Sequence, residues 1–264
     1  MTIPVVTMSV PVGPGDAPLL VLGPSLGTSA ILWEDVVPML SDRFRVVVWD
    51  LPGHGASAPT VVPFTVADLA DALVASVLDP FFYAGVSLGG AVGLELALRH
   101  PDRVRALAPV ASGAQLGEPA GWHDRAAQVR EQSTSSVIVA SAQRWFADGS
   151  IERRPELTGR LLHALQDADD ESYALCCEAL AAYDVRDRLG GITAPVLALW
   201  GRHDRVAPEA KSLELAEGVA DGRAVVIDGA AHQPPAEQPE ATARALRDFF
   251  GSFTSGRLTE GAAR

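Results

Sequence analysis

Short apolar runs recur along the first 110 residues, separated by turns or by amphipathic stretches. Runs of this length, rich in Val, Leu and aromatic residues, are typical of strands buried on both faces of a sheet. They cover residues 5–10, 19–22, 45–49, 81–86 and 104–108. Helical patterns at 66–78 and up to about His100 lie between them, and this alternation predicts a mostly parallel sheet with helices on both faces.

The alternation stops after residue 112. From about Gly113 to Leu189 nearly every segment has a helical pattern, and helices without a strand cannot extend a sheet. Strands resume at 196–200 and 224–227, and an amphipathic helix from about 236 to 250 follows. The sequence therefore predicts a core formed by residues 1–112 and 190–264, with an inserted helical lid at 113–189.

Composition narrows the possible classes of function. With 21 basic and 33 acidic residues, the net charge of −12 disfavours binding to nucleic acid or to an anionic membrane surface. No apolar stretch approaches 18 residues, and no Lys or Arg precedes Arg43, so a membrane span and a secretory signal are not expected. The adjacent Cys176 and Cys177 are too close for an unstrained disulfide. We expect a cytoplasmic protein whose two cysteines are reduced and bind no metal.

The segment GVSLGG, residues 85–90, places Ser87 where an apolar strand meets a helical run. Such a sharp turn needs small neighbours and exposes its serine at the carboxyl end of the sheet, where sites form in folds of this class. The pattern by itself also fits an ordinary turn that contains serine. Ser87 is the candidate nucleophile if the chain also supplies a base and an acid.

A serine hydroxyl becomes a strong nucleophile only when a neighbouring base takes its proton. His232 lies in DGAAHQPP, between the last strand and the last helix, which is again a carboxyl-end loop. The other histidines lie in a turn, at a helix end, on lid helices or beside a candidate acid; they are His54, His100, His123, His163 and His203. We predict His232 as the base, and we interpret His54, in PGHG, as part of a turn that supports the site.

The base needs a carboxylate that fixes its tautomer and stabilises the imidazolium. Asp204 follows a strand in LWGRHDRVAP, whereas Asp228 lies four residues before His232 and is better placed to shape that turn. The predicted chain order is therefore Ser87, Asp204, His232. Backbone N–H groups of Leu88 and of Leu26, in GPSLGTS, are the predicted donors to a tetrahedral oxyanion.

Taken together, these motifs resemble the α/β-hydrolase superfamily along essentially the whole chain. They are GPSLGTS, WDLPGHGAS, GVSLGG, RHPDRV, APVLALWGRHDRVAP and GAAH. The segments LGPSLGTSAILWEDVVPML, RAAQVREQS, RWFADG and AAYDVRDRLGGITAPVL are most similar to 3-oxoadipate enol-lactonases of the β-ketoadipate pathway. Two departures, the proline of DLPGHGAS and the two prolines just past the base in HQPPAEQPE, lie near the predicted pocket mouth.

The resemblance implies an α/β-hydrolase fold and hydrolysis of 3-oxoadipate enol-lactone without a metal or organic cofactor. This substrate carries a carboxylate, so the lid is expected to supply a cation, for which Arg130 and Arg144 are candidates, and an apolar wall, for which Trp145 is one. Packing or a solvated helix face explains these three residues equally well. Two alternatives stay open: an esterase or lactonase for another acyl group, and a ligand-binding module on the same fold.

Overall fold

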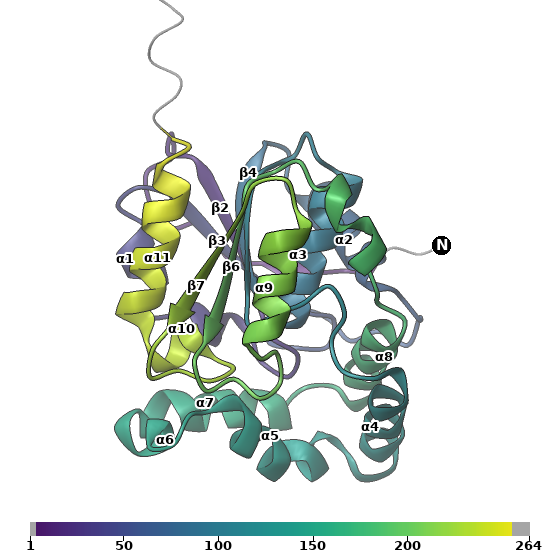
Figure 1. Ribbon diagram of the computed structural model, residues 1–264. Coiled ribbons are helices and arrows are strands. Elements are labelled where there is room, and N and C mark those ends of the chain that lie inside the picture. Colours follow the sequence, from purple (N-terminus) through teal and green to yellow (C-terminus); the bar gives the residue numbers. More distant parts are fainter. Residues whose placement is uncertain (1–3, 255–264) are drawn as a thin grey trace, which may run out of the picture.

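The strands of the computed structural model, which describes residues 4–254, form one twisted sheet (Figure 1). Its order is β1-β3-β2-β4-β5-β6-β7, and every neighbouring pair is parallel except β1 with β3. The strands are β1 Thr7–Met8, β2 Leu19–Gly23, β3 Arg45–Asp50, β4 Phe81–Val86, β5 Val104–Val110, β6 Val196–Gly201 and β7 Gly222–Ile227. The predicted mostly parallel sheet is confirmed.

Helices cover both faces of this sheet. Figure 1 shows α1 and α11 on one face and α2, α3 and α9 on the other. Their bounds are α1 Val37–Leu40, α2 Val66–Ser76, α3 Leu88–Arg99, α9 Glu209–Gly218, α10 Pro234–Glu237 and α11 Pro239–Gly251, with 3-10 turns η1 Ala30–Trp33 and η3 Arg186–Gly191. Every residue of β2, β4 and β6 is buried, which explains why these strands appear in the sequence as continuous apolar runs.

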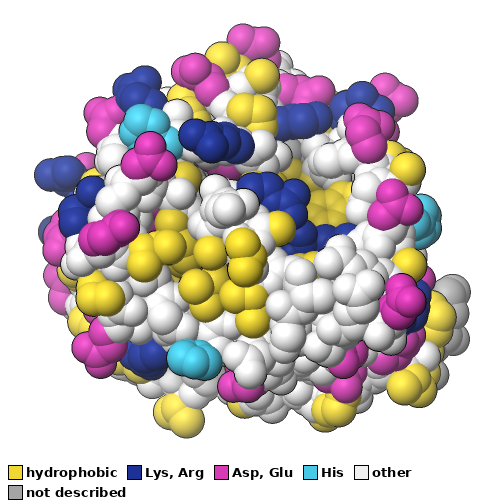
Figure 2. Space-filling view, turned by 90° about the horizontal axis from the view of Figure 1, so that it is seen from below, with side chains coloured by type: hydrophobic (Ala, Val, Ile, Leu, Met, Phe, Trp, Pro, Cys, Tyr) yellow, Lys and Arg dark blue, Asp and Glu magenta, His cyan; other side chains and the backbone are white. Residues whose placement is uncertain are grey.

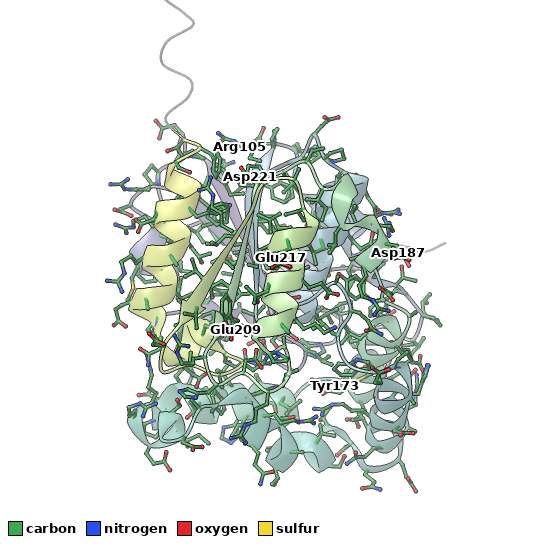
Figure 3. The ribbon with its side chains drawn as sticks, in the orientation of Figure 1. Arg105, Tyr173, Asp187, Glu209, Glu217 and Asp221 are labelled. Carbon is green, nitrogen blue, oxygen red and sulfur yellow. The ribbon has the colours of Figure 1, made fainter. Side chains whose placement is uncertain are left out.

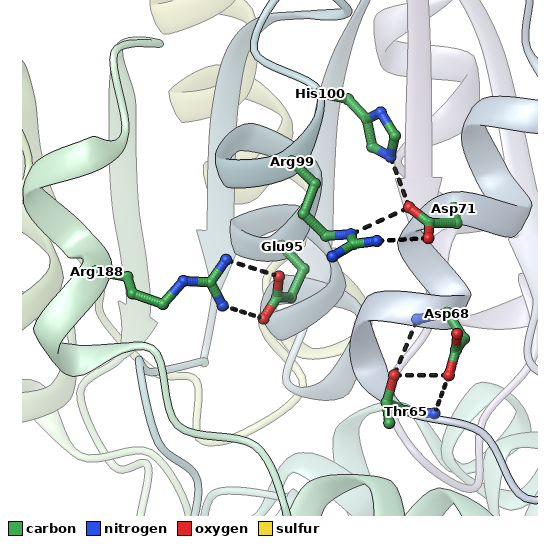
Figure 4. Close-up of polar contacts among 7 residues, drawn as sticks. All are labelled: Thr65, Asp68, Asp71, Glu95, Arg99, His100 and Arg188. Carbon is green, nitrogen blue, oxygen red and sulfur yellow. Dashed lines mark hydrogen bonds and ion pairs between the residues drawn. The ribbon is translucent and has the colours of Figure 1, made fainter.

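Polar contacts fix the ends of α2 and α3 (Figure 4). Thr65 and Asp68 form a reciprocal capping box that starts α2. The end of α3 is held by Asp71 of α2. Asp71 accepts hydrogen bonds from Arg99 and pairs with His100, whose Nε2 lies 2.7 Å from Asp71 Oδ1. His100 therefore joins two core helices at a distance from the carboxyl edge of the sheet, in the structural role expected of it.

Several elements differ from the sequence prediction. The first strand is only Thr7–Met8, because it pairs at the sheet edge and both Val5 and Val10 are exposed. The last predicted helix is two helices, since Pro239 restarts the backbone after Gln238 leaves helical geometry. Helix α9 was not predicted because only Ser212 and Leu215 of it are buried, which leaves almost no apolar face in the sequence.

Helices α4 to α8 lie beneath the carboxyl ends of the strands (Figure 1). They are α4 Pro119–Gln132, α5 Ile138–Trp145, α6 Ser150–Arg153, α7 Pro155–Gln166 and α8 Asp170–Ala181, with the 3-10 turn η2 Thr134–Val137. Cys176 and Cys177 are free and buried in α8, where burial raises the pKa of both thiols. Among the helices within residues 4–254, none is long and apolar enough to cross a membrane.

Candidate active site

Ser87 lies on a tight turn between β4 and α3. Its φ of 54° and ψ of −113° form a backbone conformation that residues with a Cβ rarely adopt. Glycines on either side permit this turn, because a Cβ on Gly85 would lie 2.4 Å from the Gly89 carbonyl, and one on Gly89 would lie 2.5 Å from Pro24 O. The small residues of GVSLGG are therefore required by the close approach of three backbone segments.

Asp204 and His232 meet in the loops that follow β6 and β7. His232 Nδ1 lies 2.9 Å from Asp204 Oδ2, and both side chains are almost fully buried. The other carboxylate oxygen accepts hydrogen bonds from the backbone N–H groups of Val206 and Ala207, at 2.8 and 3.0 Å. Since an ionised carboxylate can only accept, Nδ1 carries a proton, and in the neutral ring Nε2 is then the acceptor.

The alternative acid, Asp228, lies elsewhere. Its side chain is 77% exposed and pairs with Arg202 at the surface. It therefore shapes a surface turn, as the sequence suggested, and makes no contact with the imidazole of His232.

The loop after β2 brings Leu26 next to Ser87. Pro24 O accepts the Gly89 N–H at 3.0 Å, which ties this loop to the first turn of α3, and Leu26 and Ser87 line one cavity. Within residues 4–254, the N–H groups of Leu26 and Leu88 donate to no other protein group. Two unpaired donors thus flank the serine, as expected of a site that stabilises an oxyanion.

Ser87 and His232 line the same narrow cavity, of about 40 Å³, with Arg144 and Trp145 of α5. A wider groove of about 510 Å³ opens outside it. The two spaces share four lining residues, which are Trp122, Arg125, Arg144 and Val206. The lid therefore presents two guanidinium groups where the outer groove meets the serine.

Arg130 is not part of this site, so that prediction is corrected. Its guanidinium pairs with Glu171 at 2.7 Å and with Glu178, on a partly exposed face formed by α4 and α8. These two carboxylates raise the pKa of Arg130 above its ordinary value. A guanidinium already paired with two carboxylates, which lines neither the cavity nor the groove, is not available to a substrate.

Arg125, which was not among the predicted site residues, takes the place expected for Arg130. Its Nε donates to Tyr173 Oη and one terminal nitrogen to Ser141 Oγ, both at 2.8 Å. Tyr173 lies near the start of α8, buried in the helical layer beneath the sheet (Figure 3). The available signal was helical spacing, because Arg125 lies three residues after Trp122 and four before the buried Val129.

Within the described part of the chain, Arg125 and Arg144 have no carboxylate within salt-bridge distance. Burial lowers the pKa of the Arg144 guanidinium, and the positive charge of Arg125 adds to the effect. Figure 2 shows Lys and Arg side chains gathered at a hollow on the lid face. Two cations without a protein counter-ion favour an anionic ligand there.

Comparison with known proteins agrees with this geometry. The family model for the alpha/beta hydrolase fold matches residues 18–239. The chain belongs to the α/β-hydrolase family. The match covers the strands and loops that carry Ser87, Asp204 and His232, and the resemblance drawn from the sequence is confirmed.

Individual relatives of this hydrolase include lactonases and esterases. It is 35% identical to 3-oxoadipate enol-lactonase 2 of Acinetobacter baylyi, over 91% of each chain. It is 32% identical to a pimeloyl-(acyl-carrier protein) methyl ester esterase of Neisseria meningitidis serogroup B, over 84% of this chain and 89% of the other. The crystal structure of the enol-lactonase from Burkholderia xenovorans LB400 is similar with a TM-score of 0.88 and 33% identity, over 93% of this chain and 96% of the other.

His54 of the hydrolase supports the loop that carries Leu26. Its Nε2 accepts the Gly27 N–H at 3.2 Å and its Nδ1 lies 2.9 Å from Pro52 O, so the ring must be neutral, with its proton on Nδ1. The ring is almost fully buried, and burial lowers its pKa to about 4. The interpretation of His54 as a supporting residue agrees with these contacts.

This lowered pKa predicts an acid-dependent loss of stability. Between about pH 6.5 and pH 4 the unfolded chain binds a proton at His54 that the folded chain does not, so the free energy of unfolding falls as the pH falls through this window. The expected contribution is about 3 kcal/mol. Denaturant unfolding at a series of pH values should show a shallower profile for His54→Gln and an unchanged one for exposed His163→Gln. Parallel profiles for the wild type and His54→Gln would contradict the assignment.

Proposed function

We propose that this hydrolase opens the lactone ring of 3-oxoadipate enol-lactone through an acyl-enzyme on Ser87. The observation that carries the proposal is the pair of lid guanidinium groups beside the cavity of Ser87 and His232, which have no carboxylate partner among residues 4–254. An enol-lactone that carries a carboxylate matches both features: an acyl carbon for the serine and an anion for the arginines. The relatives that are enol-lactonases support the same substrate class.

The first chemical step forms the acyl-enzyme. Ser87 Oγ attacks the lactone carbonyl while His232 Nε2 takes the hydroxyl proton, and the Asp204 carboxylate stabilises the imidazolium. The N–H groups of Leu26 and Leu88 stabilise the tetrahedral oxyanion. When the intermediate collapses, the ring C–O bond breaks and the leaving oxygen becomes an enolate tethered to the acyl chain.

The second step releases the product. The His232 imidazolium gives its proton to the enolate oxygen, and tautomerisation of the resulting enol to a ketone removes the oxygen nucleophile that would close the ring again. His232 then activates a water molecule, which attacks the acyl carbon, and Ser87 Oγ leaves with a proton from the imidazolium. Lactone and water together give the dicarboxylate 3-oxoadipate, and the steps use only side chains and backbone donors of the chain.

The lid arginines supply the selectivity that the net charge of −12 opposes. Arg144 and Arg125 reach the cavity from two different helices, α5 and α4, and Trp145 forms an apolar wall beside them. A hydrogen bond from a guanidinium to a carboxylate contributes about 1.5–3 kcal/mol. That range corresponds to about ten- to a hundredfold in affinity.

Replacing Arg144 with alanine is therefore expected to raise KM for the enol-lactone by about ten- to a hundredfold. Hydrolysis of 4-nitrophenyl acetate, which has no carboxylate, should change little. Arg130→Ala is the matched control, because its guanidinium is paired at the lid surface. Arg144 does not bind the substrate carboxylate if Arg144→Ala raises KM for both substrates equally. The same conclusion follows if Arg130→Ala raises KM for the lactone more than Arg144→Ala does.

A second candidate is a carboxylesterase for a longer acyl group. The groove of about 510 Å³ beyond Arg144 favours it, and so do relatives that are methyl ester esterases. Comparing kcat/KM for the enol-lactone, for dicarboxylate half esters of increasing length and for an aryl ester separates the two. The proposal predicts the highest kcat/KM for the lactone, and a higher value for a long half ester would overturn it. Absence of both turnover and Ser87 labelling by a fluorophosphonate would instead indicate a ligand-binding module.

A further inference from the structure

Glu237 is a buried carboxylate with four hydrogen-bond donors around it, and only 5% of the residue is exposed. It lies at the end of α10, five residues after His232. Its two oxygens serve two different segments of the chain. One accepts hydrogen bonds from the lid, and the other accepts them from the loop that holds the candidate base.

The lid partners of Glu237 come directly after α5 in the chain. We call the end of this helix, which carries Arg144 and Trp145, the substrate arm. Glu237 Oε1 accepts the Ala147 N–H at 2.7 Å and the Ser150 hydroxyl at 2.8 Å. Ala147 lies two residues beyond Trp145, so its position constrains the end of the helix that carries Arg144. These partners are separated from Glu237 by 90 and 87 residues in the chain.

The other oxygen of Glu237 holds the loop between β7 and α10, which contains His232 and which we call the base loop. Glu237 Oε2 accepts the Ala231 N–H at 2.8 Å and the Gln233 N–H at 3.3 Å. His232 itself donates its backbone N–H to Trp145 O at 3.0 Å. Three consecutive N–H groups of the base loop are therefore held, one by the lid backbone and two by a single carboxylate oxygen.

We propose that Glu237 is a positioning residue that holds the base loop of His232 and the substrate arm of Arg144 and Trp145 in one fixed relation. The inference rests on the proposed acyl transfer for the roles of these residues. Through one oxygen the carboxylate orients the imidazole toward Ser87, and through the other it sets the guanidinium at the cavity.

An ionised carboxylate fits this position, because it can accept a hydrogen bond from each of its four neighbours. An amide would direct its NH₂ at one of the two segments, and the Ala147 N–H or the base-loop N–H groups would lose their acceptor. Ser150 can adapt by rotating its hydroxyl, since it also accepts a hydrogen bond from Arg153 at 2.9 Å. Burial raises the pKa of the Glu237 carboxyl, whereas its hydrogen bonds lower it.

Glu237→Gln tests the proposal, with Glu240→Gln on the exposed first turn of α11 as the control for loss of one acidic charge. We expect Glu237→Gln to lower kcat for 4-nitrophenyl acetate or to raise KM for the enol-lactone by about tenfold or more, depending on which segment the amide faces. Glu240→Gln should match the wild type. Active sites are titrated, so that loss of folded protein is not counted as loss of rate.

Ser150→Ala is a milder second variant that removes one lid donor and leaves the base loop held. It should raise KM for the enol-lactone severalfold and leave kcat for the neutral ester unchanged. If Glu237→Gln only lowers the melting temperature and keeps both kinetic constants per active site, the proposal is wrong. The same conclusion follows if Ser150→Ala lowers kcat for the neutral ester and leaves KM for the lactone unchanged.

If the proposed lactonase function is wrong, the role of Glu237 can still be tested. A wild type that turns over the neutral ester but not the lactone leaves the base-loop effect of Glu237→Gln measurable. For a wild type without any turnover, the downfield ¹H NMR signal of the His232 Nδ1–H proton is the readout. It should broaden or shift in Glu237→Gln and stay unchanged in Glu240→Gln, and an unchanged signal in both variants would overturn the proposal.

Discussion

Ser87→Ala is expected to lower kcat for both the enol-lactone and an aryl ester by about four orders of magnitude or more. Removing the hydroxyl removes the only proposed nucleophile, while the Leu26 and Leu88 N–H donors keep some residual stabilisation of the oxyanion. Alanine keeps the Cβ that the turn already accommodates at a φ of 54°, so the melting temperature should stay close to that of the wild type. Steady-state kinetics with thermal unfolding on the same preparations measures both.

Two controls accompany this variant. Fluorophosphonate labelling should be lost with Ser87→Ala, and Ser112→Ala should keep it, although Ser112 Oγ donates to Ser87 O at 2.8 Å. If Ser87→Ala retains more than about a tenth of the wild-type kcat, Ser87 is not the nucleophile.

Asp204→Asn is expected to lower kcat by about three to four orders of magnitude. The amide oxygen of the asparagine would take the position of Oδ1, because that oxygen accepts the Val206 and Ala207 N–H groups. The NH₂ group must then face His232 Nδ1. Nδ1 then becomes an acceptor, the ring proton moves to Nε2, and the imidazole can no longer take the proton of Ser87. The fold should persist, because the backbone contacts of the loop persist.

Asp228→Asn provides the matched comparison for that variant. It makes the same chemical change four residues before His232, but the Asp228 side chain is 77% exposed and contacts Arg202 instead. Its kcat should equal that of the wild type. A larger loss in Asp228→Asn than in Asp204→Asn would show that the wrong carboxylate is assigned to the base.

Local patterns in the sequence were sufficient to predict the fold and the positions of the three candidate catalytic residues. Buried strands such as Phe81–Val86 are continuous apolar runs, and GVSLGG combines a strand end with glycines that the backbone requires. His232 and Asp204 follow strands whose carboxyl ends share one edge of a parallel sheet. Chain order and strand position therefore predicted their meeting.

The lid residues that line the cavity were harder to predict from the sequence, because their positions depend on how the lid helices pack. Arg125 and Arg130 lie on one helix. Helical spacing favours Arg125, but the contact of α4 with α8 decides which guanidinium reaches the cavity and which pairs with Glu171. Glu237 is a further example, since its lid partners are about 90 residues distant and nothing local in HQPPAEQPE marks them. Contacts between distant segments have no periodic signature in the sequence.

The most direct test is to mix the wild type rapidly with 3-oxoadipate enol-lactone, quench within the first turnover and determine the mass of the intact protein and its peptides. Opening a lactone releases no fragment, so the proposed acyl-enzyme carries the mass of the whole lactone, on the peptide that contains Ser87. That adduct should form and decay at rates consistent with kcat. Turnover of the lactone with an adduct on a different residue, or at an unchanged rate in Ser87→Ala, would contradict the proposed mechanism.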